Sequence, residues 1–135
     1  MTLGIITNRL GKAVFLEHAF MTSTTTTLAS QFKVGTGQTV LDEGSTDLSQ
    51  PVYITGTQEY GEFTTGFPTI STSGATPEIT INCRLSGNQS TGNTLDTIAL
   101  FNTDTTPKLM IQMNHADESK GVTDEFIYII KQRVL

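Results

Sequence analysis

Residues 78–85 read Glu-Ile-Thr-Ile-Asn-Cys-Arg-Leu, a segment in which polar and apolar residues alternate without interruption. Successive side chains of a β-strand point to opposite faces of the sheet, so the four odd-numbered residues share one face. Cys83 lies on that face, which favours a small buried hydrophobic residue over a reactive nucleophile. It is also the only cysteine, so the chain can form no internal disulfide, and nothing indicates export to an oxidising compartment.

Similar patterns continue on both sides of this segment. Residues 95–101 form a short, mostly apolar run between turn residues, which predicts a strand buried on both faces. The odd positions of 108–113 are apolar and predict another strand, after which residues 114–123 form a polar excursion. The hydrophobic run at 125–135 predicts a long central strand. Shorter strands are expected upstream, at residues 31–34, 52–55 and 59–65.

The composition agrees with a mostly β domain. Threonine is abundant, with clusters at 24–27 and 103–106, and only 16% of the residues are charged. Because threonine is β-branched, it favours pleated strands over helices. We therefore predict an antiparallel β-sandwich or barrel-like domain. Its core is expected to contain Ile79, Ile81, Cys83, Leu85, Ile98, Leu100, Leu109, Ile111, Phe126 and Tyr128.

The amino-terminal residues differ from the rest of the chain. Residues 5–20 are the best candidate for a short helix, with Thr7 or Asn8 as the N-cap residue. The same residues also fit a strand through Val14 and Leu16.

We therefore divide the chain into an amino-terminal arm or helix, residues 1–30, and a β domain, residues 31–135. Residues 21–30 are polar and are expected to form a loop. A polar arm cannot offset its own ordering entropy, so we expect this extended arm to be ordered by contacts with neighbouring subunits.

The charge distribution argues against several classes of partner. The net charge is −5, and no basic residue occurs between Lys33 and Arg84, whereas several acidic residues do. Nucleic-acid binding requires a basic surface that displaces counterions from phosphates, so we expect no nucleic-acid partner. The acidic segment is either a solvated face or a surface that meets a basic partner. No run approaches the roughly 20 apolar residues of a membrane span, and no basic segment precedes a hydrophobic core, so we expect neither membrane insertion nor a signal peptide.

Residues 32–40, Phe-Lys-Val-Gly-Thr-Gly-Gln-Thr-Val, contain two glycines at the spacing that opens some phosphate-binding loops. A dinucleotide fingerprint requires a third glycine where this chain has Val40, and a P-loop requires a Gly-Lys-Ser/Thr that is absent here. Acidic residues follow at once and would repel a phosphate. We therefore predict that Gly35 and Gly37 turn the chain after a strand, with a positive φ at one of them at least.

Other candidate sites lack the required partners. His18 and His115 are the only histidines, and a metal site needs three or four converging ligands. Ser86-Gly87 lacks the Gly-x-Ser-x-Gly pattern of a nucleophile elbow. Paired acids of a glycosidase would need aromatic platforms for the sugar, and tryptophan is absent. We therefore expect no catalytic, cofactor-binding or metal-binding residues, and no enzymatic activity.

A series of short segments resembles a known family. "GIITNRLGKA" is followed by "FKVGTGQTV" and "STDLSQPV", and much later by "LDTIALFNTDTTPKLMIQ", the lysine of "SKGV" and the closing "EFIYIIKQRVL". In this order they resemble the amino-terminal, virion-attaching domain of phage tail-collar fibre proteins and related small phage tail proteins.

In that family a strand ends in a Val-Gly-x-Gly-like turn, and a later buried strand resembles Ile-x-Glu-Ile-Gly-Leu-Phe. Residues 98–101, Ile-Ala-Leu-Phe, match the end of the buried strand, with Ala99 where the family prefers glycine. Lys120 occupies the place of the lysine before the final strand. The threonine-rich middle segment departs from the family, since it lacks the longer, tryptophan-bearing stretch.

The resemblance implies a bacteriophage virion structural protein, made in the host cytoplasm, without catalysis or a cofactor. It would attach a fibre or appendage to the tail, collar or baseplate, contacting other virion proteins as a homo-oligomer such as a trimer. A capsid decoration protein would share the same composition. A carbohydrate-binding module is an alternative from a different class, and its sugar platforms would be Tyr53, Tyr60 or Tyr128.

Overall fold

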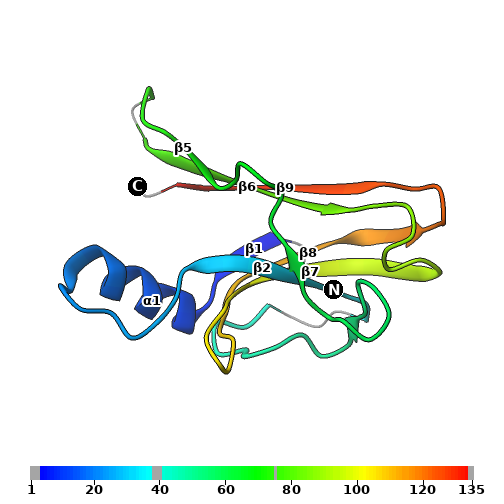
Figure 1. Ribbon diagram of the computed structural model, residues 1–135, viewed down its shortest axis with the longest axis horizontal. Coiled ribbons are helices and arrows are strands. Elements are labelled where there is room, and N and C mark those ends of the chain that lie inside the picture. Colours follow the sequence, from blue (N-terminus) through cyan, green and yellow to red (C-terminus); the bar gives the residue numbers. More distant parts are fainter. Residues whose placement is uncertain (1–3, 38–40, 75, 134–135) are drawn as a thin grey trace.

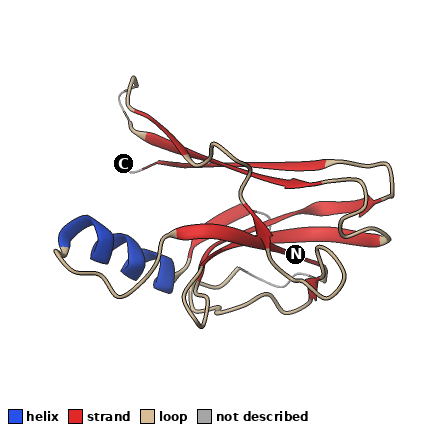
Figure 2. Cartoon of the chain, in the orientation of Figure 1, coloured by secondary structure: helices blue, strands red, loops and turns tan. Residues whose placement is uncertain are grey.

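The computed structural model describes residues 4–37, 41–74 and 76–133, which form two antiparallel β-sheets stacked face to face (Figure 1). Figure 2 shows that strands dominate these residues and that a short helix lies at one end of the sheets. The predicted fold class, a mostly β antiparallel sandwich with a short amino-terminal helix, is therefore confirmed.

The two sheets differ in size. The larger sheet has the strand order β1 (Gly4–Thr7), β8 (Leu109–Lys120), β7 (Asn93–Asn102), β2 (Ala29–Gly35) and β3 (Pro51–Val52), and β4 (Gly61–Glu62) also pairs with β2. The smaller sheet has the order β5 (Thr69–Ser71), β6 (Glu78–Leu85) and β9 (Phe126–Arg133). Helix α1 (Arg9–Phe20) follows β1.

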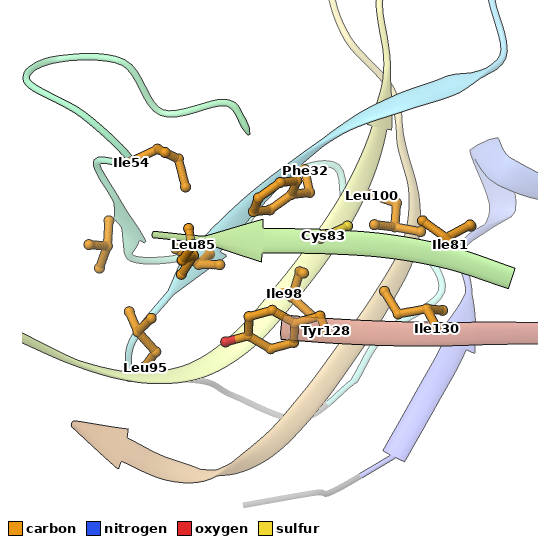
Figure 3. Packing of buried hydrophobic residues seen from close by; sticks show 12 residues of the cluster. Phe32, Ile54, Ile81, Cys83, Leu85, Leu95, Ile98, Leu100, Tyr128 and Ile130 are labelled. Atoms are coloured by element: carbon orange, nitrogen blue, oxygen red, sulfur yellow. The ribbon is translucent and has the colours of Figure 1, made fainter. Parts of the chain in front are cut away.

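The main core lies between the two sheets (Figure 3). The alternation predicted for residues 78–85 is confirmed from Ile81 onward, because Ile81, Cys83 and Leu85 are buried whereas Arg84 is exposed. Ile79, also expected in the core, is only half-buried and is not a member of the core, so that part of the prediction is wrong. The buried members of this core are Phe32, Val34, Val52, Ile54, Ile81, Cys83, Leu85, Leu95, Ile98, Leu100, Tyr128 and Ile130.

The opposite face of the larger sheet carries a second, smaller core. The chain between β2 and β4 covers this face, and Tyr60 packs edge-on against Phe101 with ring centroids 5.4 Å apart. Residues 95–101 are thus buried on both faces, as predicted. The buried members of the second core are Leu48, Ala99, Phe101 and Leu109.

Leu109 was expected in the main core beside Ile111, and this prediction is wrong. Leu100 lies opposite Ile111, but the next residue of β7, Phe101, lies opposite Leu109, so β8 has one extra residue between the two pairs. A β-bulge of this kind turns the following side chain to the other face of the sheet. Leu109 therefore packs with Phe101 in the second core.

The polar excursion expected at residues 114–123 is mostly strand. β8 continues to Lys120, because its polar second half pairs with the beginning of β7, where Asn93 lies opposite Lys120 and Leu95 lies opposite Glu118. Pairing with a neighbouring strand thus overrides the low strand propensity of a segment such as Asn-His-Ala-Asp-Glu.

The last strand is an edge strand rather than the central strand that we expected. Among the described strands, β9 pairs only with β6. Tyr128 and Ile130 face the main core, whereas Ile127 and Ile129 point outward and are 52% and 60% exposed. The strand is therefore apolar on both faces without being buried on both faces.

The amino-terminal segment belongs to the sandwich. β1 pairs along β8, with Ile5 opposite Met113, and β2 begins at Ala29, so the boundary expected at residue 30 does not separate an arm from the β domain. The predicted helix is present but begins at Arg9, with Asn8 in the N-cap position and β1 before it.

Gly11 fixes helix α1 against the larger sheet. A Cβ at Gly11 would lie 2.3 Å from the carbonyl oxygen of Met110, so only glycine allows the helix to approach β8 this closely. The N–H of Asn8 donates to the same carbonyl (2.8 Å), and the Asn8 Nδ2 donates to the carbonyls of Asp42 and Ser45. These contacts hold the start of α1 in one position.

We expect the Cys83 thiol to be unreactive toward a disulfide reagent in the native protein. The side chain is fully buried, and burial raises its pKa to about 12, so almost no thiolate exists at neutral pH. Labelling should become fast only in denaturant, whereas a cysteine introduced by Ile127→Cys on the outer face of β9 should react at once. Fast labelling of Cys83 in the folded wild type would contradict this packing.

Candidate functional site

Helix α1 exposes most of its apolar side chains. Only Gly11 and Val14 are buried, whereas Phe15 and Leu16 are each 54% exposed and Phe20 is 79% exposed. Leu16 and Phe20 are one helical turn apart, so they share one face, and Val14 lies on the opposite side. Phe15, Leu16 and Phe20, with Met21 at 62% exposure, form what we call the helix surface.

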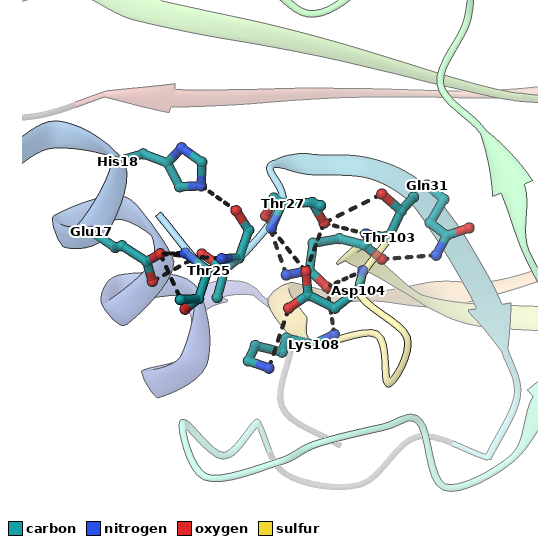
Figure 4. Close-up of polar contacts among 10 residues, drawn as sticks. Glu17, His18, Thr25, Thr27, Gln31, Thr103, Asp104 and Lys108 are labelled. Carbon is teal, nitrogen blue, oxygen red and sulfur yellow. Dashed lines mark hydrogen bonds and ion pairs between the residues drawn. The ribbon is translucent and has the colours of Figure 1, made fainter. Parts of the chain in front are cut away.

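The threonine cluster after α1 folds back onto the helix (Figure 4). The carboxylate of Glu17 accepts hydrogen bonds from the backbone N–H groups of Thr25 and Thr26 and from their hydroxyls. The ring of His18 lies 2.7 Å from the carbonyl oxygen of Thr26. The backbone N–H of Thr25 is the main cause that lowers the pKa of Glu17, so this carboxylate stays ionised and keeps its hydrogen bonds.

A second carboxylate ties the same segment to the sheet. Asp104, between β7 and β8, accepts hydrogen bonds from the N–H (2.8 Å) and the hydroxyl (3.0 Å) of Thr27. The Thr27 N–H is the largest cause that lowers the pKa of Asp104. Gln31 and Asn102 add side-chain hydrogen bonds to backbone carbonyls. The residues around Thr24–Thr27 therefore have ordered partners within the chain, which the sequence did not indicate.

The open side of the smaller sheet is the second apolar surface. In the described part of the chain no strand pairs with the outer edge of β9. Ile127 and Ile129 project from the outer face of β9, whereas Ile70 of β5 pairs with Ile79 on the core-facing side of the same sheet and is 70% exposed. β1 carries Ile5 on the main-core side, opposite Met113, yet Ile5 is 44% exposed. The smaller sheet therefore leaves part of the larger sheet uncovered.

Gly35 and Gly37 form a turn, as predicted. Gly37 has a φ of 64°, which favours glycine. Gly35 ends β2 in a crowded position, since a Cβ there would lie 2.9 Å from the carbonyl oxygen of Gln50. The N–H of Thr36, which would point at a bound phosphate, donates instead to the Gln50 carbonyl (3.0 Å). Residues 38–40 of this segment lie outside the described residues.

The candidate site residues do not come together. His18 bonds to Thr26, while the Nε2 of His115 lies 3.0 Å from the hydroxyl of Tyr128. Ser86 donates its hydroxyl to Asn88 in the β6–β7 loop. Within the described residues, no group of three or more His, Cys, Asp or Glu side chains is placed to hold a metal ion.

Two buried lysines have structural partners. Lys33 is 3% exposed, pairs with Asp47 (3.1 Å) and Glu59 (2.9 Å), and lies over the ring of Tyr60. Burial works to lower the pKa of Lys33, but these ion pairs outweigh it and the pKa is raised, so the lysine is charged. No sequence pattern indicated this arrangement, apart from a lysine between Phe32 and Val34.

Lys120, the lysine singled out by the family resemblance, is 1% exposed. Its Nζ donates to the carbonyls of Gly87 and Gly121, at 3.1 Å each. It therefore ties the β6–β7 loop to the turn between β8 and β9, and its role is to hold this end of the sandwich together.

The three tyrosines considered as sugar platforms differ in exposure. Tyr128 is 9% exposed, and burial raises the pKa of its hydroxyl. Tyr60 packs against Phe101 and under Lys33. Only Tyr53 presents its ring to solvent, with 52% of its surface exposed.

No protein-family model, curated protein or solved structure matches this chain. The described residues also contain no helix that is long and apolar enough to cross a membrane.

We expect Gly37→Ala to lower the free energy of unfolding by roughly 1 kcal/mol or more, because an alanine is strained at a positive φ. Gly74→Ala is the matched control, since its nearest contact is 3.9 Å away and its backbone is not left-handed. Urea unfolding of both variants measures the difference. A thermal shift of the wild type with ATP, GTP or NAD that Gly37→Ala abolishes would contradict a purely structural turn.

Proposed function

We propose that this chain is a structural protein of a bacteriophage particle, a tail, collar or baseplate component that joins a fibre or appendage to the particle. The order of the short segments that resemble the tail-collar fibre family supports the phage assignment. The exposed helix surface supports a role in assembly. In this role the protein has no catalytic activity and needs no cofactor.

The helix surface is the observation that carries the proposal. Monomeric soluble proteins expose scattered apolar residues, but gathered large ones mark interaction sites. Phe15, Leu16 and Phe20 lie within two turns of one helix, and each is more than half exposed. Burying such a side chain against a partner contributes about 1.5–3 kcal/mol. This surface is therefore where we place the contact with a neighbouring virion protein.

The edge of β9 offers a second contact. An unpaired strand edge can accept another strand through its backbone groups. Ile5, on the main-core side of β1 in the larger sheet, is also left partly uncovered, at 44% exposure. Two separated contact surfaces on one chain suit a protein that bridges neighbours in a symmetric assembly, and a homo-oligomer such as a trimer would use one of them between its own copies.

A capsid decoration protein remains the second candidate, because the same two surfaces would serve to bind a capsid lattice. The position of the chain in the particle separates the two functions. Cryo-electron microscopy of particles from the phage that encodes it should place the density on the tail, collar or baseplate. Density spread over the capsid would favour decoration, and absence of the chain from purified particles would overturn both.

We expect the double variant Leu16→Lys/Phe20→Lys to fold normally but to be lost from assembled particles. Both side chains are exposed in the isolated chain, so charges there cost little stability, whereas burying a lysine in an apolar contact is costly. Val122→Lys, at a position that is 67% exposed in the turn before β9, is the control and should assemble like the wild type. The measurement is the copy number in particles after complementation of a deletion, with circular dichroism as the check of folding. Normal incorporation of the double variant would refute the role of the helix surface.

A further inference from the structure

A groove lies between the segment that begins with β3 and the β6–β7 loop. Its volume is about 540 Å³, within the range of small-molecule binding sites. None of the residues that line it belongs to the helix surface. The polar residues that line it include Thr36, Gln50, Tyr53, Asn88, Thr91 and Asn93.

The two walls of the groove are fixed to each other by Ser90. This residue is 4% exposed, its N–H donates to the carbonyl of Ile54 (3.0 Å), and its hydroxyl donates to the carbonyl of Tyr53 (3.0 Å). Its φ is 51°, a conformation that costs energy for serine and is kept because both hydrogen bonds require it. Asn93 donates to the carbonyls of Ser90 and Thr91 and holds the loop further. The groove is therefore preorganised.

None of the described residues that line the groove has a charged side chain. A site for phosphate or carboxylate would use arginine or lysine, and a site for a cation would use carboxylates. Amide and hydroxyl groups instead donate and accept hydrogen bonds without charge. This lining therefore fits a neutral ligand that is rich in hydroxyl groups.

Tyr53 supplies the apolar element of the groove. Its ring is half exposed, although its backbone carbonyl is fixed by Ser90. An aromatic ring of this kind offers a flat apolar face and a polar hydroxyl at its tip. A pyranose has the matching properties, with C–H groups on one face and hydroxyls around the rim.

We propose that this groove binds a neutral saccharide, with one sugar ring stacked on Tyr53 and its hydroxyls bonded to the side-chain amides of Gln50 and Asn88 and to the Oδ1 of Asn93. The inference does not depend on the assembly role of the helix surface, because none of the groove residues belongs to it. A single aromatic platform limits the affinity to the millimolar range for a monosaccharide.

The test uses the complete chain, labelled with nitrogen-15, and amide chemical shifts during titration with glucose, galactose, mannose and N-acetylglucosamine and with their disaccharides. We expect saturable shifts confined to residues of the two walls, with a Kd in the millimolar range for at least one sugar. Tyr53→Ala should weaken that binding about tenfold or more, whereas Tyr53→Phe should keep most of it because the ring remains.

Two controls make the result decisive. Ile70→Ala removes an apolar side chain that is more exposed than Tyr53 (70% against 52%) from β5, outside the groove, and should leave the Kd unchanged. Glucose 6-phosphate carries a negative charge that a lysine or arginine in the groove would attract. Because neither is among the described residues that line the groove, this sugar should bind no better than glucose. No saturable shift in the two walls with any of the sugars, or binding that Tyr53→Ala leaves intact, would overturn the proposal.

Discussion

Every residue of β7 from Leu95 to Asn102 is buried, so this strand requires cover on both of its faces. The smaller sheet covers one face through Cys83 and Tyr128, and the chain between β2 and β4 covers the other through Leu48 and Tyr60. β7 also pairs with β2 on one side and β8 on the other, which makes it the centre of the larger sheet. The remaining elements are arranged around this double burial. Of the two buried lysines, Lys33 lies opposite Ala99 beside the second core, and Lys120 lies opposite Asn93 at the start of β7.

The sequence was sufficient to predict the strands where the pattern of apolar residues indicates which side chains are buried. The alternation at 78–85 and the continuous apolar run at 95–101 identified β6 and β7 and hence the sandwich. It was insufficient where pairing decides the outcome. The polar end of β8 is a strand because β7 offers a partner, and the bulge that moves Leu109 to the second core has no periodic signature. The apolar run at the carboxyl end could not distinguish a central strand from an edge strand with an exposed outer face.

The candidate residues that the sequence singled out lie apart in the structure, and the exposed apolar surfaces were not predicted. Gly35 and Gly37 serve the turn, and the two histidines bond within separate neighbourhoods. The helix surface was missed because the segment 9–20 has no clean amphipathic period, so its apolar residues gave no direction. The groove at Tyr53 was missed because its two walls are joined by a hydrogen bond between Ser90 and Ile54. These residues are 36 positions apart in the sequence, so no local pattern predicts the contact.

The helix surface is exposed to solvent, but the helix that carries it is held to the rest of the chain, which bears on the proposed role in assembly. Gly11 lets α1 approach β8, while Glu17 and Asp104 hold the threonines that follow the helix. These contacts hold the helix that carries Phe15, Leu16 and Phe20 in one position on the sheet. A partner that docks on a fixed surface loses less conformational entropy than one that must order a flexible arm. The threonine cluster thus has partners within the chain, where we had expected contacts with neighbouring subunits, and in the proposed role the exposed apolar side chains are available to an interface.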